Sequence, residues 1–168
     1  MRKKHGITLL AACALTAMLG TSALAHEGGM LLQDPNAADF QSSPGVPECT
    51  SFAGLRGDIS KGPGTLMVRM RPGCVVPFHW HTPSEEIVIL QGAPLAQMLG
   101  ERPVMLKVGA YSQLPGKHVH RFRCTSKVDC VLFLVADAAF DIHFVDDSGK
   151  EISTEEALKA AATAGNDW

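Results

Sequence analysis

Residues 79–92 have the sequence HWHTPSEEIVILQG, and this stretch decides which fold we expect. His79 and His81 are two positions apart, so in a β-strand both imidazole side chains point to the same side. Thr82-Pro83-Ser84 is a turn signal, and Glu85 opens the apolar run that follows it. Because a carboxylate after a tight turn can meet both imidazoles, the stretch predicts two adjacent strands with converging polar side chains.

Glu85 alternates with Ile87 and Ile89, and this alternation predicts one buried face of the second strand. A buried carboxylate is costly unless an opposite charge compensates it, and a divalent cation supplies such a charge. Glu86 is expected to point the other way, toward solvent or a neighbouring subunit. A slip of one residue in the strand register would put Glu86 in the place of Glu85.

Short apolar or alternating runs, separated by turns that contain Gly or Pro, continue along most of the chain. The expected strands span residues 66–70, 75–81, 85–90, 95–98, 104–107, 110–114, 120–124, 131–135 and 142–145. No helix is expected between them, so the pattern predicts an all-β antiparallel barrel or sandwich. Pro94 marks a poor position for a central strand.

A third histidine, His120, begins one of the later strands. Its alternates Phe122 and Cys124 are expected to face the interior with it, while Arg121 and Arg123 point to solvent. His120 can therefore close a pocket that the first pair of histidines already lines.

The spacing of these residues resembles the two sequence motifs of the cupin family. The first motif, G-x5-H-x-H-x3-E-x6-G, matches residues 73–92, and the second, G-x5-P followed by His, matches residues 109–120. The second motif usually has Gly and Asn where this chain has Lys117 and Cys124. The resemblance covers roughly residues 52–146. It implies an all-β, antiparallel, jelly-roll-like cupin β-barrel, as in small single-domain cupins of bacteria.

The resemblance also implies one divalent metal ion bound by His79, His81, Glu85 and His120. Three neutral imidazoles and one carboxylate suit Mn, Fe, Co, Ni, Cu or Zn, and the supply in the compartment decides between these metals. Four protein ligands on a six-coordinate ion would leave two adjacent positions open for a small ligand.

Three other histidines compete with this set. His118 is expected to be a solvated loop residue, and His143 a structural residue of a late strand. His26 would become the N-terminus after processing, where an amine and an imidazole can chelate copper. Such a site needs a further nearby histidine, and nothing in the sequence indicates one.

For the function, the resemblance implies an enzyme or a binding protein for a small polar or anionic molecule. The enzyme would be a metal-dependent oxidoreductase, isomerase or decarboxylase, and no residue is identified as its general acid or base. The alternative is a non-catalytic periplasmic module that binds a metal or a small ligand. A third hypothesis is a structural cupin whose barrel serves a dimer interface, since cupin relatives often form homodimers.

The first 25 residues have the pattern of a signal peptide, with basic residues 2–4, an apolar run at residues 7–19 and Ala23-Leu24-Ala25. A lipoprotein-like box that ends at Cys13 is the alternative processing signal. We therefore expect a periplasmic or secreted protein. Loss of the three basic residues leaves 12 basic and 17 acidic residues, a net charge of −5. This charge argues against nucleic acids and anionic membranes as partners.

Export would place Cys49, Cys74, Cys124 and Cys130 in an oxidising compartment, where they can form two disulfides in three pairings. Cys124 and Cys130 flank a loop that resembles a hairpin, which favours their pairing and leaves Cys49–Cys74 by elimination. Free, buried cysteines are the alternative.

The two ends of the mature chain are expected to lie outside the barrel. Residues 26–51 are rich in Pro, Gly, Ser, Asp and Gln and are expected to form an irregular arm. Residues 147–168 form a C-terminal tail, in which Ser153 and Glu156 fit a capping box. Alanine-rich residues 157–162 follow, so the tail is expected to contain a short helix.

Overall fold

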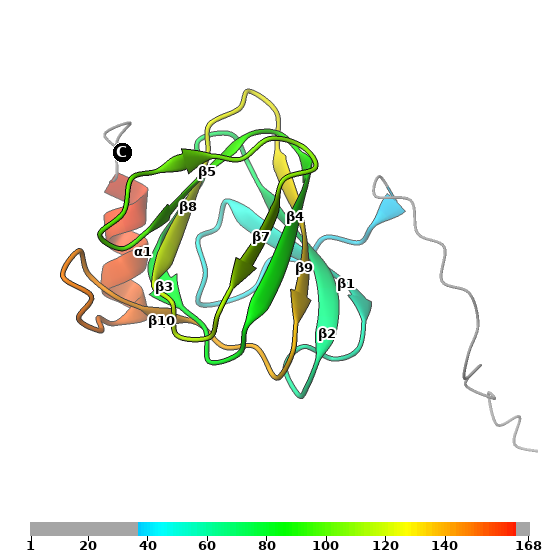
Figure 1. The fold of residues 1–168 in the computed structure, drawn as a ribbon, viewed down its shortest axis with the longest axis horizontal. Coiled ribbons are helices and arrows are strands. Elements are labelled where there is room, and N and C mark those ends of the chain that lie inside the picture. Colours follow the sequence, from blue (N-terminus) through cyan, green and yellow to red (C-terminus); the bar gives the residue numbers. More distant parts are fainter. Residues whose placement is uncertain (1–36, 164–168) are drawn as a thin grey trace, which may run out of the picture. The chain divides into compact units, whose positions relative to one another are not determined.

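The computed structural model describes residues 37–163. The predicted signal peptide, the alternative lipidation site Cys13, His26 and the first part of the predicted arm lie outside these residues. Within the described range the chain forms two β-sheets and one C-terminal α-helix (Figure 1).

The strands form two five-stranded sheets in which every pairing of named strands is antiparallel. The first sheet consists, in spatial order, of β1 (Thr50–Arg56), β2 (Gly64–Met70), β9 (Cys130–Ala136), β4 (Glu85–Gln91) and β7 (Tyr111–Leu114). The second consists of β10 (His143–Phe144), β3 (Val75–Trp80), β8 (His120–Cys124), β5 (Pro94–Met98) and β6 (Val104–Met105). The predicted all-β antiparallel fold is confirmed, and every predicted strand is present with small shifts at its ends. Pro94 is the first residue of β5, a position where a strand tolerates the missing amide donor.

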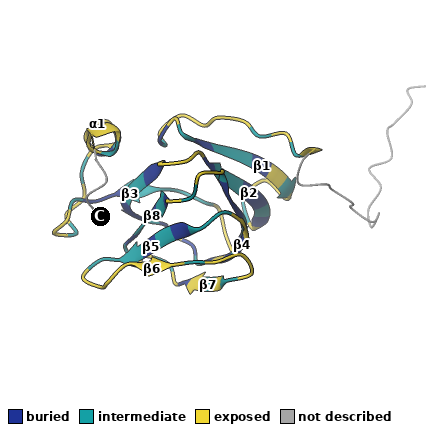
Figure 2. Cartoon of the chain, turned by 90° about the horizontal axis from the view of Figure 1, so that it is seen from above, coloured by how far each residue is buried: buried dark blue, intermediate teal, exposed yellow. Residues whose placement is uncertain are grey.

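Alternate residues of the strands form an apolar layer between the two sheets. Leu66 lies opposite Leu134, which in turn lies opposite Ile87, and all three side chains are buried. In the neighbouring row Leu132 lies opposite Ile89. Figure 2 shows buried positions on strands of both sheets, whereas β6 and β7, each at the edge of its sheet, are largely exposed. These rows fix the register, because a slip of one residue would turn them toward solvent.

Strand β1 is not predicted by the sequence pattern. Its sequence, TSFAGLR, contains small and polar residues and a glycine, so local propensity does not favour a strand. Pairing along β2, with Phe52 opposite Val68, supplies the stabilisation instead. The chain just before β1 is attached to the same sheet, because Gln41 forms an isolated bridge with Phe52. Phe40 also packs there, with the Arg69 guanidinium 3.7 Å from its ring centre.

Two turns contain residues of the motifs. Gly92 has a φ of +78°, and a Cβ at this position would lie 2.8 Å from the Asp129 carbonyl oxygen and 2.9 Å from the Cys130 Cα. Glycine is therefore required there. Lys117 stands where the resembled motif usually has glycine, and it keeps a positive φ of 65°. Its backbone N–H donates to the His81 carbonyl at 2.8 Å, which helps to offset a strain of about 1–2 kcal/mol.

The predicted C-terminal helix is present as α1 (Thr154–Thr163). The Ser153 hydroxyl accepts a hydrogen bond of 3.2 Å from the Glu156 backbone N–H, as an N-cap does. Ala157 is fully buried, and the helix contacts β3 and β10. Packing on the second sheet therefore supports a helix that is too short to persist alone.

The four cysteines form the predicted pairs, Cys49–Cys74 and Cys124–Cys130, with Cα atoms 5.5 Å and 5.6 Å apart. The second disulfide joins the end of β8 to the start of β9 and so links the two sheets. No helix among residues 37–163 is long and apolar enough to cross a membrane. The disulfides are compatible with a secreted protein.

Replacement of both Cys124 and Cys130 by alanine should lower the free energy of unfolding by about 2–4 kcal/mol, because the disulfide limits the freedom of the unfolded chain. Urea denaturation without reductant measures this loss. Alkylation of the denatured parent protein should label neither cysteine, and labelling of both would contradict the bridge.

The Gly92→Ala substitution should destabilise the protein by about 1–3 kcal/mol more than Gly100→Ala. Both glycines have a positive φ, but a Cβ at Gly100 would meet nothing within 4 Å, so this control isolates the clash with the backbone of residues 129 and 130. Equal unfolding midpoints for the two variants would show that the backbones do not approach each other so closely.

Candidate metal centre

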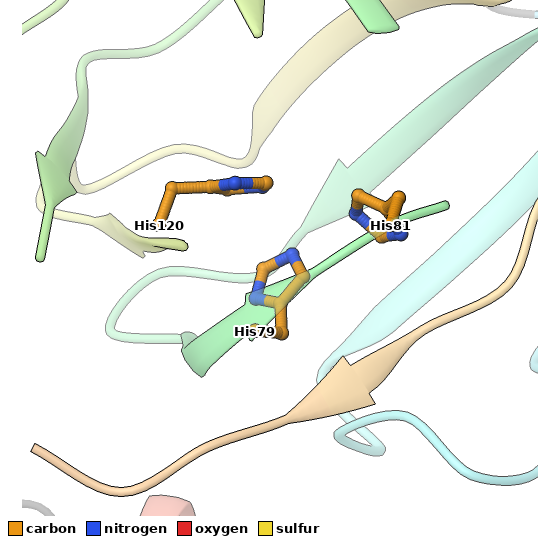
Figure 3. Close-up of side chains that lie close together, drawn as sticks. All are labelled: His79, His81 and His120. Carbon is orange, nitrogen blue, oxygen red and sulfur yellow. The ribbon is translucent and has the colours of Figure 1, made fainter. Parts of the chain in front are cut away.

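Three histidine side chains converge inside the barrel. His79 belongs to β3, His81 follows the last residue of that strand, and His120 is the first residue of β8. His79 lies opposite His120 in the pairing of these strands. One ligand nitrogen of each ring lies within 4.8 Å of the others, and all three residues are buried. Figure 3 shows the rings arranged around a common space, so His79 and His81 share the interior face as predicted.

The orientation of each ring is fixed by a backbone carbonyl. The Nδ1 of His79 lies 2.6 Å from the Pro77 oxygen, and the Nδ1 of His120 lies 2.8 Å from the His118 oxygen. The Nδ1 of His81 contacts the Asp141 oxygen. Because a carbonyl only accepts, each Nδ1 must carry a proton, so in the neutral ring the Nε2 is the nitrogen with a free lone pair. In histidines that bind a metal through one ring nitrogen, the other ring nitrogen typically donates such a hydrogen bond to a carbonyl or carboxylate.

The protonation of the cluster also suits a metal ion. Burial lowers the pKa of His79 well below its ordinary value, and the nearby His120 and His81 lower it further. Burial also lowers the pKa of His81, although Glu85 acts in the opposite direction. Both rings are therefore neutral at neutral pH, and the neutral imidazole is the form that binds a metal ion.

Glu85, the first residue of β4, lies beside the histidines with its side chain 3% exposed. Its Oε1 lies 3.1 Å from the Nε2 of His120, and its Oε2 lies 3.9 Å from the Nε2 of His81. Neither Glu85 Oε1 nor His120 Nε2 has a hydrogen-bond partner in the structure. Two buried acceptors that face each other repel unless a cation or a proton lies between them. Glu86, by contrast, is exposed, as the alternation predicted.

The histidine cluster and Glu85 have the chemistry that a bound metal ion requires. The three histidines could hold an ion, since they offer three nitrogen donors that converge from β8 and from the end of its neighbour β3. The orphaned pair formed by Glu85 and His120 adds a reason for a positive charge at this place. The donor set therefore fits a divalent transition metal.

The segment 140–142 completes the surroundings of His81, and the sequence analysis missed it. The ring of Phe140 stacks on His81, with ring centres 4.0 Å apart. The Asp141 carboxylate accepts hydrogen bonds from the Thr82 backbone N–H at 2.7 Å and from the Thr82 hydroxyl at 2.5 Å. Asp141 is about 60 positions away from His81 and lies in no motif, so no local signal indicates this contact.

The other described histidines lie outside the cluster. His118 is exposed, as expected for a loop residue, and contributes its backbone carbonyl to the orientation of His120. His143 stacks on Trp80, with ring centres 3.9 Å apart and an interplanar angle of 4°. Its Nε2 also lies 3.2 Å from the Asp141 carboxylate. These contacts agree with a structural role for His143.

A cavity of about 420 Å³ adjoins the cluster. His79, His81, Glu85 and His120 form part of its wall, together with residues of both sheets. The arm residues 41–44 and the segment 140–142 also line it. A volume of this size is within the range of small-molecule pockets.

Replacement of Asp141 by alanine should lower the free energy of unfolding by about 1–2 kcal/mol, because two hydrogen bonds to a half-exposed carboxylate are lost. Thermal or urea denaturation measures this change. Asp147→Ala is the control, since Asp147 is an exposed residue of the neighbouring turn. Equal losses in the two variants would show that the contact with Thr82 contributes nothing.

Comparison with known proteins agrees with this geometry. Residues 66–136 match the family model of the cupin domain. No curated protein matches the chain in sequence. Many solved structures are similar to the chain. The three described next have low sequence identity to it, so their likeness shows the fold alone.

The polyketide cyclase RemF from Streptomyces resistomycificus has a TM-score of 0.64 and 18% identity, and the match covers 80% of this chain and 94% of the cyclase. An RmlC-like cupin from Shewanella frigidimarina has a TM-score of 0.53 and 13% identity, with 66% and 92% covered. The DMSP lyase DddQ from Ruegeria pomeroyi has a TM-score of 0.52 and 23% identity, with 61% of this chain but only 57% of the lyase covered. Family model and fold agree, and residues 66–136 of this chain are a cupin domain.

Proposed function

We propose that this protein binds one divalent transition-metal ion through His79, His81, Glu85 and His120, and that the ion anchors a small molecule in the adjoining cavity. The observation that carries the proposal is the buried contact between Glu85 Oε1 and His120 Nε2, 3.1 Å apart and without other partners. Since the Nδ1 of His120 donates to the His118 carbonyl, the neutral form of this ring would present the lone pair of its Nε2 to the carboxylate. A cation that binds both groups removes this repulsion.

A proton on the Nε2 of His120 would also join the two groups. It would give an imidazolium–carboxylate pair, which is costly to bury unless every remaining polar atom is satisfied. His79 and His81 would then present two further lone pairs to the same space without a partner for them. A metal ion satisfies all four side chains together, so the arrangement favours metal over proton.

The donor set admits Mn, Fe, Co, Ni, Cu or Zn, and availability in the compartment decides which metal binds. With Glu85 ionised, a divalent ion would leave the site with one net positive charge, which favours an anionic or oxygen-bearing end of the small molecule. When bound, such an ion supplies Lewis-acid polarisation of a ligand oxygen. The protein's own residues hold the donors in place and surround the ligand with the walls of the barrel.

An enzyme that performs oxidation, isomerisation or decarboxylation is one form of this function. The similar structures include a polyketide cyclase and a DMSP lyase, which supports a small-molecule role, although the cupin fold hosts many reactions. A non-catalytic binding protein is the second candidate. It is favoured because, among the described residues that line the cavity, Asp141 is the one titratable group outside the four proposed ligands. Its carboxylate already contacts Thr82 and His143.

Export to the periplasm or the outside of the cell is part of the proposal. It is supported by the signal-like pattern of residues 1–25 and by the two disulfides, which persist in oxidising compartments. The ion would then come from the supply outside the cytoplasm.

Glu85→Gln should weaken the binding of Zn²⁺ by roughly 100-fold, because the substitution removes the charged donor and keeps the shape of the side chain. Titration calorimetry on protein stripped of metal measures this loss. Glu86→Gln is the matched control, since Glu86 is the next residue of the same strand and points away from the cluster.

If Glu86→Gln lost the metal and Glu85→Gln kept it, the proposed donor would be wrong. If neither variant nor His79→Ala changed the affinity, the cluster would not be the metal site. Turnover of a panel of small organic acids by the metal-loaded parent would favour the enzyme, and tight metal retention without any reaction would favour the binding protein.

A further inference from the structure

The cavity beside the histidine cluster has walls made mostly of hydrocarbon. The first sheet contributes Leu66 and Val68 of β2 and Leu132 and Leu134 of β9 to these walls. The second sheet contributes Phe122 of β8. The four proposed metal ligands are part of this same wall, so the cavity combines one polar region with an extended apolar one.

Several of the apolar side chains that line the cavity are not fully covered by the protein. Phe52, Val68, Val76, Phe140 and Ile142 are half-buried, although they belong to the barrel strands or the segment beside them. Phe52 and Val68 lie opposite each other on β1 and β2, in the row that continues to the buried Leu132. Apolar surface inside a barrel that stays accessible in this way favours an apolar occupant.

The described lining of the cavity provides no cationic side chain for a second anionic group. No lysine or arginine occurs among the described residues that line the cavity. The hydroxyl of Thr50 already donates to the Pro47 carbonyl at 2.7 Å, and the Asp141 carboxylate accepts from Thr82. Glu85 adds negative charge, so an anionic ligand would find its positive partner at the metal and nowhere else on this wall.

We infer that the ligand of this site is a mostly hydrocarbon molecule with its oxygen donors gathered at one end. The inference rests on the proposed function, because the oxygen-bearing end is the part that meets the metal. The body of the molecule lies against Val68, Leu132 and Phe122. A small dianion such as oxalate matches the metal but leaves these apolar walls uncovered.

The test compares three probes of increasing hydrocarbon size, catechol, 4-ethylcatechol and 4-butylcatechol, with oxalate. Titration calorimetry under nitrogen on the zinc-loaded protein and on the metal-free protein measures each affinity. Burial of each added methylene should tighten binding by about fourfold at best, so each two-carbon step should give roughly tenfold. Oxalate should bind more weakly than 4-butylcatechol.

Two variants locate the effect. Val68→Phe places a larger side chain in the cavity and should abolish the gain from the butyl chain while zinc still binds with one ion per chain. Ile142→Ser serves the same purpose if the first variant does not fold, because it removes apolar wall without adding volume. Val128→Phe is the control, since Val128 is an exposed loop residue that does not line the cavity.

The outcomes separate this inference from the metal proposal. If the protein binds one zinc ion and prefers oxalate, with equal affinities for all three catechols, the apolar ligand is refuted and the metal site stands. If the affinity rises with chain length but zinc does not bind, the hydrocarbon body of the ligand stands, and the metal site with the oxygen-bearing end that it would bind is refuted. A gain from the butyl chain that survives in both Val68→Phe and Ile142→Ser would also overturn the inference.

Discussion

The fixed orientation of three imidazole rings is the constraint on which the candidate site depends. Each Nδ1 donates to a backbone carbonyl, and Glu85 lies beside the Nε2 atoms of His81 and His120. For His79 and His120 the carbonyl lies two residues earlier in the chain, so the local strand geometry supplies it. For His81 it comes from Asp141, which connects the site to the last part of the barrel. Backbone carbonyls that are near in sequence and one that is far away in sequence therefore orient the same set of donors.

This donor set lies in surroundings that do not favour charge. Glu85 is almost completely buried, and it shares its strand face with Ile87 and Ile89. Such an arrangement costs stability unless the charge is compensated, and proteins retain costs of this kind at functional sites. Paired apolar rows across β2, β9 and β4, together with the Cys124–Cys130 disulfide that links the two sheets, hold the surrounding frame. The strained backbone of Lys117, beside the site, is retained within the same frame.

The cavity wall has a polar part and an apolar part, and the strand geometry of the fold explains why both face the same ligand space. Because side chains alternate along each strand, the same inner face that carries His79 and Glu85 also carries the aliphatic residues of the neighbouring strands. A single pocket therefore has a polar end with converging donors and an apolar body without cationic residues among the described lining. The arm before β1 and the segment 140–142 close parts of this wall, so residues outside the motifs also shape the space.

The sequence by itself determined the alternation of the strands, the turns and the spacing of His79, His81, Glu85 and His120, because these signals lie within a few residues of each other. It also indicated the helix cap and the cysteine pairs. Only the tertiary structure decided that β1 is a strand, since its pairing with β2 outweighs its weak local propensity. Likewise, Asp141 meets His81 across about 60 positions, and the cavity wall joins residues of both sheets. Contacts between distant segments arise from packing, and no local pattern encodes them.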